Sequence, residues 1–138
     1  MSASRKLYSP FDRWAFGWIP FWAVTIVIVR GAVMPPQEIP KVLLQINDKL
    51  IHATEFFVMM IVAYQTFSRA HLEKIYRHRF ADAILYSLFL GALTECLQFF
   101  APGRSPDIFD FLADSAGALI AAGIVFLSRR VLKESERV

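Results

Sequence analysis

Four apolar segments, each about long enough to cross a lipid bilayer, most strongly limit what this chain can fold into. They cover residues 14–34, 49–67, 80–101 and 106–127 approximately. A spanning helix needs about 20 mainly apolar residues, and a hydrophobic fraction of 56% exceeds that of an ordinary soluble domain. A soluble bundle would also carry polar stripes along whole helices. We therefore predict an all-α integral membrane bundle of four transmembrane helices, formed as a single domain over residues 1–138.

The N-terminal segment and the single cysteine add two smaller expectations. Arg5 and Lys6 precede a long apolar run, but no clear small-x-small cleavage pattern follows, so we predict an uncleaved anchor rather than a signal peptide. Cys96 is the only cysteine, which excludes an intramolecular disulfide. We expect it to be a buried, inert thiol inside the third span.

Lysine and arginine flank the spans unevenly, and this predicts the orientation in the membrane. Eleven of the fifteen basic residues lie in the N-terminal tail, the connection between the second and third spans, and the C-terminal tail. By the positive-inside rule, both termini and that connection are predicted to be cytoplasmic. The net charge of +3 therefore reflects topology. No basic stripe alternates with exposed aromatic residues, so we predict no nucleic-acid partner.

Polar side chains recur at helical spacing at the predicted outer end of three spans. Residues three or four apart share one face of a helix. The sets are Asp48, His52 and Glu55 on the second span, Glu95 and Gln98 on the third, and Asp107, Asp110, Asp114 and Gly117 on the fourth. Hydrocarbon cannot hydrogen-bond such groups, so we expect them to face each other or a water-filled cleft. Arg104 is an expected counter-charge, and Arg30 could either neutralise one of these carboxylates or snorkel to the interface.

Prolines shape both predicted outer connections. Pro35 and Pro36 interrupt the first one, and apolar residues then recur at helical spacing at Ile39, Val42, Leu43 and Ile46. This spacing is typical of a short amphipathic helix on the membrane surface that could cover the cleft, and a plain surface loop is the alternative. In the other connection, Pro102 and Pro106 are predicted to end one helix and begin the next, with Asp107 at the new helix start.

Two stretches, DKLIHATEFF (48–57) and ECLQFFAPGRSPDIFDFLADSAGALI (95–120), resemble the VanZ-like family. The family pattern is D-K-x-x-H-x-x-x-[FY], then E-x-x-Q, a turn with Arg, and D-x-x-D-x-x-x-N-x-x-G. The matching residues are Asp48, Lys49, His52, Phe56, Glu95, Gln98, Arg104, Asp107, Asp110 and Gly117. Asp114 stands where the family more often has Asn, which weakens any mechanism that requires an ionised Asp114.

The resemblance implies a small multi-pass protein of the bacterial inner membrane that acts in the cell envelope. The family is named for a protein that confers resistance to teicoplanin, a glycopeptide that acts on cell-wall precursors outside the membrane. Some members bear the label phosphotransbutyrylase, which this sequence does not support because it has no acyl-phosphate or coenzyme A motif.

Two classes of function fit the polar residues. In the first, a cleft at the extracytoplasmic face binds a membrane lipid or a lipid-linked envelope precursor, and contributes to envelope maintenance or glycopeptide resistance. Its expected ligand-binding residues are Asp48, Lys49, Gln98, Arg104, Asp107 and Asp114. In the second, a membrane-embedded enzyme uses His52 as acid or base with Glu95 and Asp110, although no recognisable nucleophile motif accompanies them. Polar groups that only fix helix packing are the structural alternative to both.

Cofactors and partners are less constrained by the sequence. No cofactor is predicted from a motif, and no metal site is assigned. A divalent metal held by His52, Glu95, Asp110 and Asp114 stays an alternative because these side chains offer nitrogen and oxygen ligands. A homo-oligomer or a membrane partner also stays open. A pore or transporter is disfavoured, because four short spans leave little room for a pathway.

Overall fold

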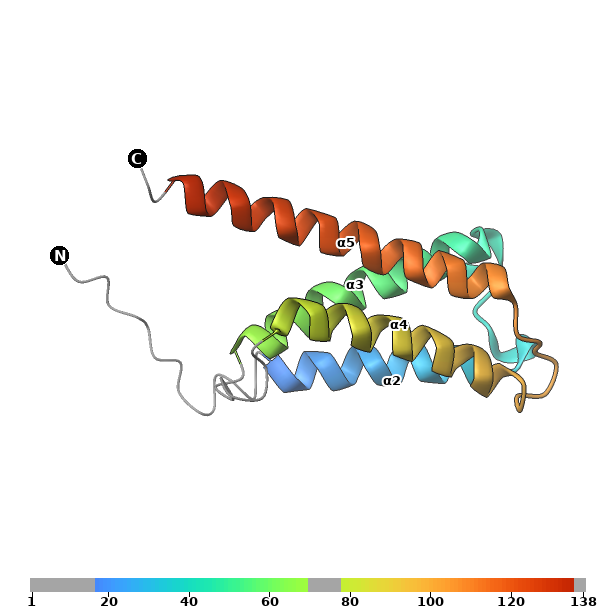
Figure 1. Ribbon diagram of the computed structural model, residues 1–138. Coiled ribbons are helices and arrows are strands. Elements are labelled where there is room, and N and C mark those ends of the chain that lie inside the picture. The colour runs from blue at the N-terminus through green and yellow to red at the C-terminus, as the bar shows by residue number, and fades with distance from the viewer. Residues whose placement is uncertain (1–16, 70–77, 136–138) are drawn as a thin grey trace.

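The computed structural model describes residues 17–69 and 78–135, which form a bundle of long helices (Figure 1). The long helices are α2 (Ile19–Val33), α3 (Asp48–Arg69), α4 (Arg79–Gln98) and α5 (Ile108–Ser135). Two short 3-10 turns, η2 (Pro36–Glu38) and η3 (Leu43–Gln45), lie between α2 and α3. The described residues contain no strand, and the predicted all-α class is confirmed.

Three of these helices are long and apolar enough to cross a membrane: Asp48–Ser68, Arg79–Gln98 and Ile108–Val131. The fourth, α2, is also apolar but has 15 residues, or about 22 Å at 1.5 Å per residue. The start of the first predicted span, residues 14–16, lies outside the described residues. The helices thus match a four-helix membrane bundle, with one helix shorter than predicted in its described part.

Two helix ends differ from the predicted spans. The third span was predicted to reach residue 101, but α4 ends at Gln98. Pro102 explains this, because it has no N–H to donate to the Gln98 carbonyl, which instead accepts from the N–H of Ala101 at 3.0 Å. The last helix continues past residue 127 to Ser135, since no proline interrupts it there.

The ends of the four helices gather at two opposite ends of the bundle (Figure 1). Helix α3 contacts each of the other three, most extensively α5. Residues 34–47 and 99–107 lie together at one end, here called the polar end. The start of α2, the ends of α3 and α5 and the start of α4 lie at the other, here called the basic end. The side of the membrane that each end faces stays a prediction.

Small side chains together with a few large apolar ones fill the interior of the bundle. The buried residues include Phe56, Met59 and Met60 of α3 and several alanines, among them Ala63, Ala83, Ala118 and Ala121. Small residues let membrane helices approach closely, where dispersion replaces the hydrophobic effect as the main attraction. Large apolar side chains such as Leu85 and Phe89 of α4 and Ile120 of α5 point outward. This inside-out distribution suits helices that are surrounded by lipid.

The connection between α2 and α3 does not form the continuous amphipathic helix that its apolar spacing indicates. Pro40 directly follows the first of these apolar positions, lacks an N–H, and disfavours helical backbone at Ile39, so no helix runs through from η2. Separate turns form on either side, with the N–H of Glu38 bonded to the Pro35 carbonyl at 2.9 Å and that of Leu43 to the Pro40 carbonyl at 2.9 Å.

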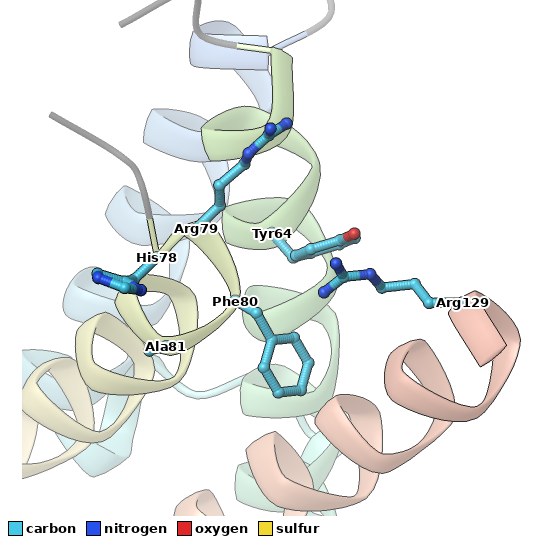
Figure 2. A pocket seen from close by; sticks show the side chains of 6 residues that line it. All are labelled: Tyr64, His78, Arg79, Phe80, Ala81 and Arg129. Atoms are coloured by element: carbon cyan, nitrogen blue, oxygen red, sulfur yellow. The ribbon is translucent and has the colours of Figure 1, made fainter. Parts of the chain in front are cut away.

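A hollow of about 460 Å³ lies at the basic end (Figure 2). Its lining residues are Tyr64, His78, Arg79, Phe80, Ala81 and Arg129. The Arg129 guanidinium carbon lies 5.9 Å from the ring centroid of Tyr64 and 6.0 Å from that of Phe80, which are cation–π distances. Aromatic and cationic side chains of this kind are typical of a membrane–water interface.

Candidate functional site

The first turn of α5 fixes the position of the acidic residues on that helix. Asp107 precedes Ile108, and its Oδ1 accepts the N–H of Phe109 at 2.8 Å, which caps the helix. The predicted helix start at Asp107 is therefore confirmed. Asp110 and Asp114 then follow on the same face of the helix and are 6% and 1% exposed.

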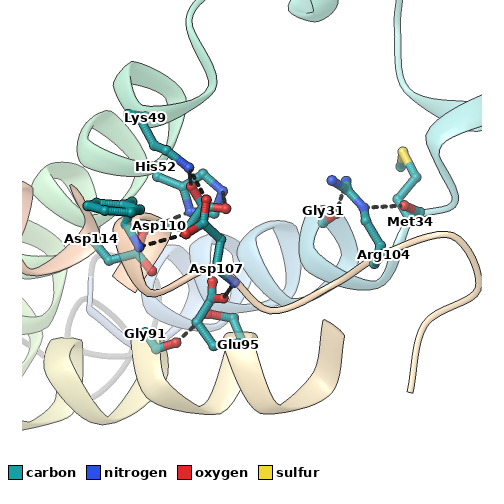
Figure 3. A network of polar contacts seen from close by, with 12 residues as sticks. Gly31, Met34, Lys49, His52, Gly91, Glu95, Arg104, Asp107, Asp110 and Asp114 are labelled. Carbon is teal, nitrogen blue, oxygen red and sulfur yellow. Dashed lines mark hydrogen bonds and ion pairs between the residues drawn. The ribbon is translucent and has the colours of Figure 1, made fainter. Parts of the chain in front are cut away.

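Lys49 supplies the positive charge for two of these acids (Figure 3). Its Nζ donates to Asp107 Oδ2 at 2.7 Å and also to Asp110 Oδ1. Lys49, and then the N–H of Phe109, hold the pKa of the Asp107 carboxyl below its usual range. The start of α3 is thereby tied to the start of α5.

His52 lies one turn further along α3, between two acids of α5 (Figure 3). Its Nδ1 is 2.9 Å from Asp114 Oδ1, and its Nε2 is 3.7 Å from Asp110 Oδ2. The His52 side chain is 14% exposed. Both ring nitrogens therefore face carboxylates, which fixes the orientation of the imidazole.

Glu95 brings the last turn of α4 to the same group. Its Oε2 accepts the N–H of Asp107 at 2.8 Å, so it bonds the backbone that leads into α5. Its Oε1 is buried, as is Asp114 Oδ2, and neither has a hydrogen-bond partner within the described residues. We call the six side chains that meet here the polar network: Lys49, His52, Glu95, Asp107, Asp110 and Asp114.

A cavity of about 630 Å³ adjoins the polar network at His52. We call it the polar-end cavity. Apolar side chains of α2, of the connection between residues 34 and 46, and of α3 form most of its wall, including Val27, Leu43, Leu44 and Ile51. Its polar lining residues are Arg30, Asp48, His52, Glu55, Thr94, Gln98 and Arg104. The connection thus covers this cavity, although not as a continuous helix.

Residues 2–129 match a family model described as VanZ/LLP1. The chain belongs to the VanZ-like family. The match includes every residue of the polar network and of the polar-end cavity. No curated protein and no solved structure matches this VanZ-like chain in the same comparisons.

The structure divides the predicted site residues of this VanZ-like protein between two adjoining places. Lys49, Glu95, Asp107, Asp110 and Asp114 meet in the polar network. Asp48, Gln98 and Arg104 instead line the polar-end cavity, and Asp48 is exposed while Gln98 is buried. Only His52 belongs to both.

Neither expected arginine neutralises the acids of the network. Arg104 donates from Nε to the Met34 carbonyl at 3.0 Å and from Nη2 to the Gly31 carbonyl at 3.2 Å (Figure 3). Arg30 pairs with Glu38 at 3.2 Å on the surface. The two arginines hold the ends of the connection between α2 and α3. Lys49 provides the counter-charge to the acids instead.

Cys96 differs from the expectation of a buried thiol, because it is exposed. It follows Glu95 directly, so on a helix the two side chains point about 100° apart. Since Glu95 faces inward, Cys96 lies on the outer surface of α4.

Two glycines lie next to the site, and the helical spacing of the sequence predicted only one of them. Gly117 falls on the polar face of α5, as its spacing predicts, but Gly91 of α4 was missed. A Cβ at Gly91 would lie 3.3 Å from both Cβ and Oδ2 of Asp114, so this glycine leaves room for the buried acid. The sequence could have indicated Gly91, because it precedes Glu95 by one helical turn on the same face of α4.

Proposed function

We propose that this VanZ-like protein binds a membrane lipid or lipid-linked envelope precursor in the polar-end cavity, at the extracytoplasmic face of the bacterial inner membrane. The observation that carries the proposal is the two-part lining of this cavity. Its volume of about 630 Å³ lies within the range of small-molecule sites, about 300–1,000 Å³.

The apolar part of the cavity suits a hydrocarbon chain. Val27, Leu43 and Leu44 line it from α2 and the connection, and Ile51 lines it from α3. Val27 and Leu44 are 63% exposed, so this wall offers apolar surface that a ligand chain would cover.

The polar part suits a headgroup with both donors and acceptors. Gln98 is 2% exposed and offers an amide, while Arg30 and Arg104 bring positive charge to the wall. His52 joins this wall to the polar network. A phosphate or amide group of an envelope lipid matches these donors.

Family membership supports a role in the envelope for this binding. Eleven basic residues on the other predicted side support an extracytoplasmic location of the polar end, where cell-wall precursors are exposed to glycopeptides. Binding a precursor or altering the outer leaflet would then contribute to envelope maintenance or to teicoplanin-type resistance.

A pair of glycine variants tests the cavity directly. A Cβ at Gly31 would meet its nearest neighbouring atom, Glu55 Oε1, at 4.0 Å, so Gly31→Leu adds bulk inside the cavity without a backbone clash. Gly123 of α5 has nothing within 4 Å of its Cβ position and lies outside the cavity, so Gly123→Leu is the matched control.

Lipid binding is measured by native mass spectrometry of the full chain, purified in detergent and mixed with a phospholipid or a polyprenyl phosphate. We expect Gly31→Leu to raise the apparent Kd for the lipid at least about tenfold, a loss of about 1.4 kcal/mol of binding free energy. Gly123→Leu should bind as the wild type does. Equal binding by the wild type and Gly31→Leu, or no saturable binding by the wild type, would contradict the proposal.

One observation favours an enzyme as the second candidate. His52 lines the cavity while carboxylates of Asp110 and Asp114 lie near its two ring nitrogens. Such an arrangement can orient an imidazole to take or give a proton at a bound ligand. Incubation of the purified protein with its bound lipid should then yield a product of changed mass that His52→Ala does not form.

A further inference from the structure

The unpartnered oxygens of the polar network suggest a ligand other than the one in the cavity. Glu95 is 9% exposed and Asp114 is 1% exposed. Each keeps one buried carboxylate oxygen, Oε1 and Oδ2, without a hydrogen-bond partner among the described residues. A buried carboxylate oxygen is costly unless a hydrogen bond or a cation satisfies it.

The charges of the surrounding groups also favour a bound cation. Among the described side chains that meet in the polar network, four are acids, and Lys49 is the one permanent cation, in contact with Asp107 and Asp110. The two arginines nearby bond backbone carbonyls and Glu38 instead. Glu95 and Asp114 therefore hold carboxylates that Lys49 does not contact.

Donor atoms of three side chains lie close enough to share one ion. One ligand atom from each of His52, Glu95 and Asp114 lies within 4.8 Å of the others. These residues come from three different helices, α3, α4 and α5, so the packing of the bundle holds them in place. Asp110 Oδ2 is a further oxygen, 3.7 Å from His52 Nε2.

We propose that His52, Glu95 and Asp114 bind a divalent transition-metal ion, such as Zn²⁺ or Mn²⁺, between α3, α4 and α5. One imidazole nitrogen with carboxylate oxygens is a donor set for these ions, whereas Mg²⁺ and Ca²⁺ prefer oxygen ligands alone. Three protein ligands leave positions for water or for a group of a bound molecule. Because His52 also lines the polar-end cavity, the ion would lie beside the lipid site, but its binding does not depend on a lipid.

The test is metal binding by the full chain in detergent, without a polyhistidine tag and after treatment with a chelator. Titration with Zn²⁺ or Mn²⁺ should show one saturable equivalent per chain and a raised melting temperature. Glu95→Gln and Asp114→Asn should each weaken binding at least about tenfold, the lower end of the effects seen when groups around a metal are changed. Mg²⁺ and Ca²⁺ should compete poorly.

Asp82→Asn is the matched control. Asp82 lies near the start of α4, also has a buried oxygen without a partner among the described residues, and is not one of the three proposed metal ligands. It should bind metal as the wild type does. The proposal is overturned if the wild type takes up no saturable equivalent, if it prefers Mg²⁺ or Ca²⁺, or if the folded Glu95→Gln and Asp114→Asn variants bind like Asp82→Asn. The wild-type titration decides the matter alone if both variants fail to fold.

Discussion

Gly117 of α5 and Ala53 of α3 bring two helix backbones into direct contact. A Cβ built on Gly117 would lie 1.9 Å from the carbonyl oxygen of Ala53 and 2.7 Å from its carbonyl carbon. No side chain other than hydrogen fits there unless a helix moves. Ala53 follows His52 directly, so this contact sets the distance across which His52 reaches Asp114.

Gly117→Ala should therefore destabilise the bundle and separate His52 from Asp114. Overpacking a tight interior costs about 1–3 kcal/mol, and a clash with backbone rather than a mobile side chain favours the upper end. Gly123→Ala, with open space around the added methyl, should be neutral or stabilise α5 by up to about 1 kcal/mol. Thermal unfolding in detergent compares the two. Equal melting temperatures for both variants would contradict the close contact between the backbones of α3 and α5 at Ala53 and Gly117.

Arg104 should contribute more to stability than Arg30, although both lie at the polar end. Arg104 donates two charge-assisted bonds to the carbonyls that end α2, and each such bond contributes about 1.5–3 kcal/mol. Arg30 forms a surface pair with Glu38, and the two side chains are 57% and 55% exposed, for which about 0–1 kcal/mol is typical. Arg104→Ala should lower the melting temperature clearly and Arg30→Ala hardly at all. A reversed order would remove the structural role assigned to Arg104.

The pH dependence of stability should carry a signature of Asp107. Because Lys49 and the Phe109 N–H lower its folded-state pKa, Asp107 contributes stability that is present above its unfolded pKa of about 4. That contribution is lost as the pH falls through the lowered folded pKa. Asp107→Asn keeps a good helix cap but removes the charge.

The melting temperature of the wild type should exceed that of Asp107→Asn at pH 6, and the difference should shrink as the pH falls from about 4 toward 2. Glu38→Gln, which removes an exposed carboxylate, controls for general acid effects. A difference that stays constant from pH 6 to pH 2 would mean that the charge of Asp107 contributes nothing.

The polar end could be predicted in part, because helical spacing alone aligns side chains within one helix. The stripes on α3, α4 and α5 follow from residues three or four apart, and the structure brings them together. Spacing does not state which residues of different helices will pair. Lys49 and Asp107 are 58 positions apart, and their contact follows from how α3 packs against α5.

Local breaks were harder to predict than the helices themselves. Apolar spacing between residues 39 and 46 indicated a helix, but the structure forms only a turn at Pro40 and the short 3-10 turn η3 there. Arg104 shows that the charge of a side chain also does not identify its partner. Its charge suggested an acidic partner, whereas its place in the turn after α4 brings it to the carbonyls of Gly31 and Met34 at the end of α2.

The orientation of the bundle can be tested with reporter fusions. The uneven distribution of basic residues predicts a cytoplasmic C-terminus and a cytoplasmic connection between α3 and α4. Alkaline phosphatase fused after residue 138, or inserted between residues 69 and 79, should be inactive. The same enzyme inserted near residue 40 should be active. Activity at residue 138 would invert the placement of the polar end.

The last prediction separates a functional site from polar residues that only hold helices together. His52→Ala, Glu95→Gln and Asp110→Asn should each abolish activity, measured as the glycopeptide-susceptibility phenotype, while the protein still accumulates and melts nearly as before. Polar contacts between membrane helices are individually weak, averaging about 0.6 kcal/mol in one measured system, so losing one should rarely unfold the bundle.

Thr25→Val is the matched control for this comparison. Thr25 Oγ1 lies 2.9 Å from the Tyr86 hydroxyl, a partly buried contact between α2 and α4 that lies outside both the network and the cavity. Its loss removes a helix-to-helix hydrogen bond without touching the proposed site, so function should persist. If the three site variants lose function only in proportion to lost folded protein, then the polar network is a packing device and the proposed site does not exist.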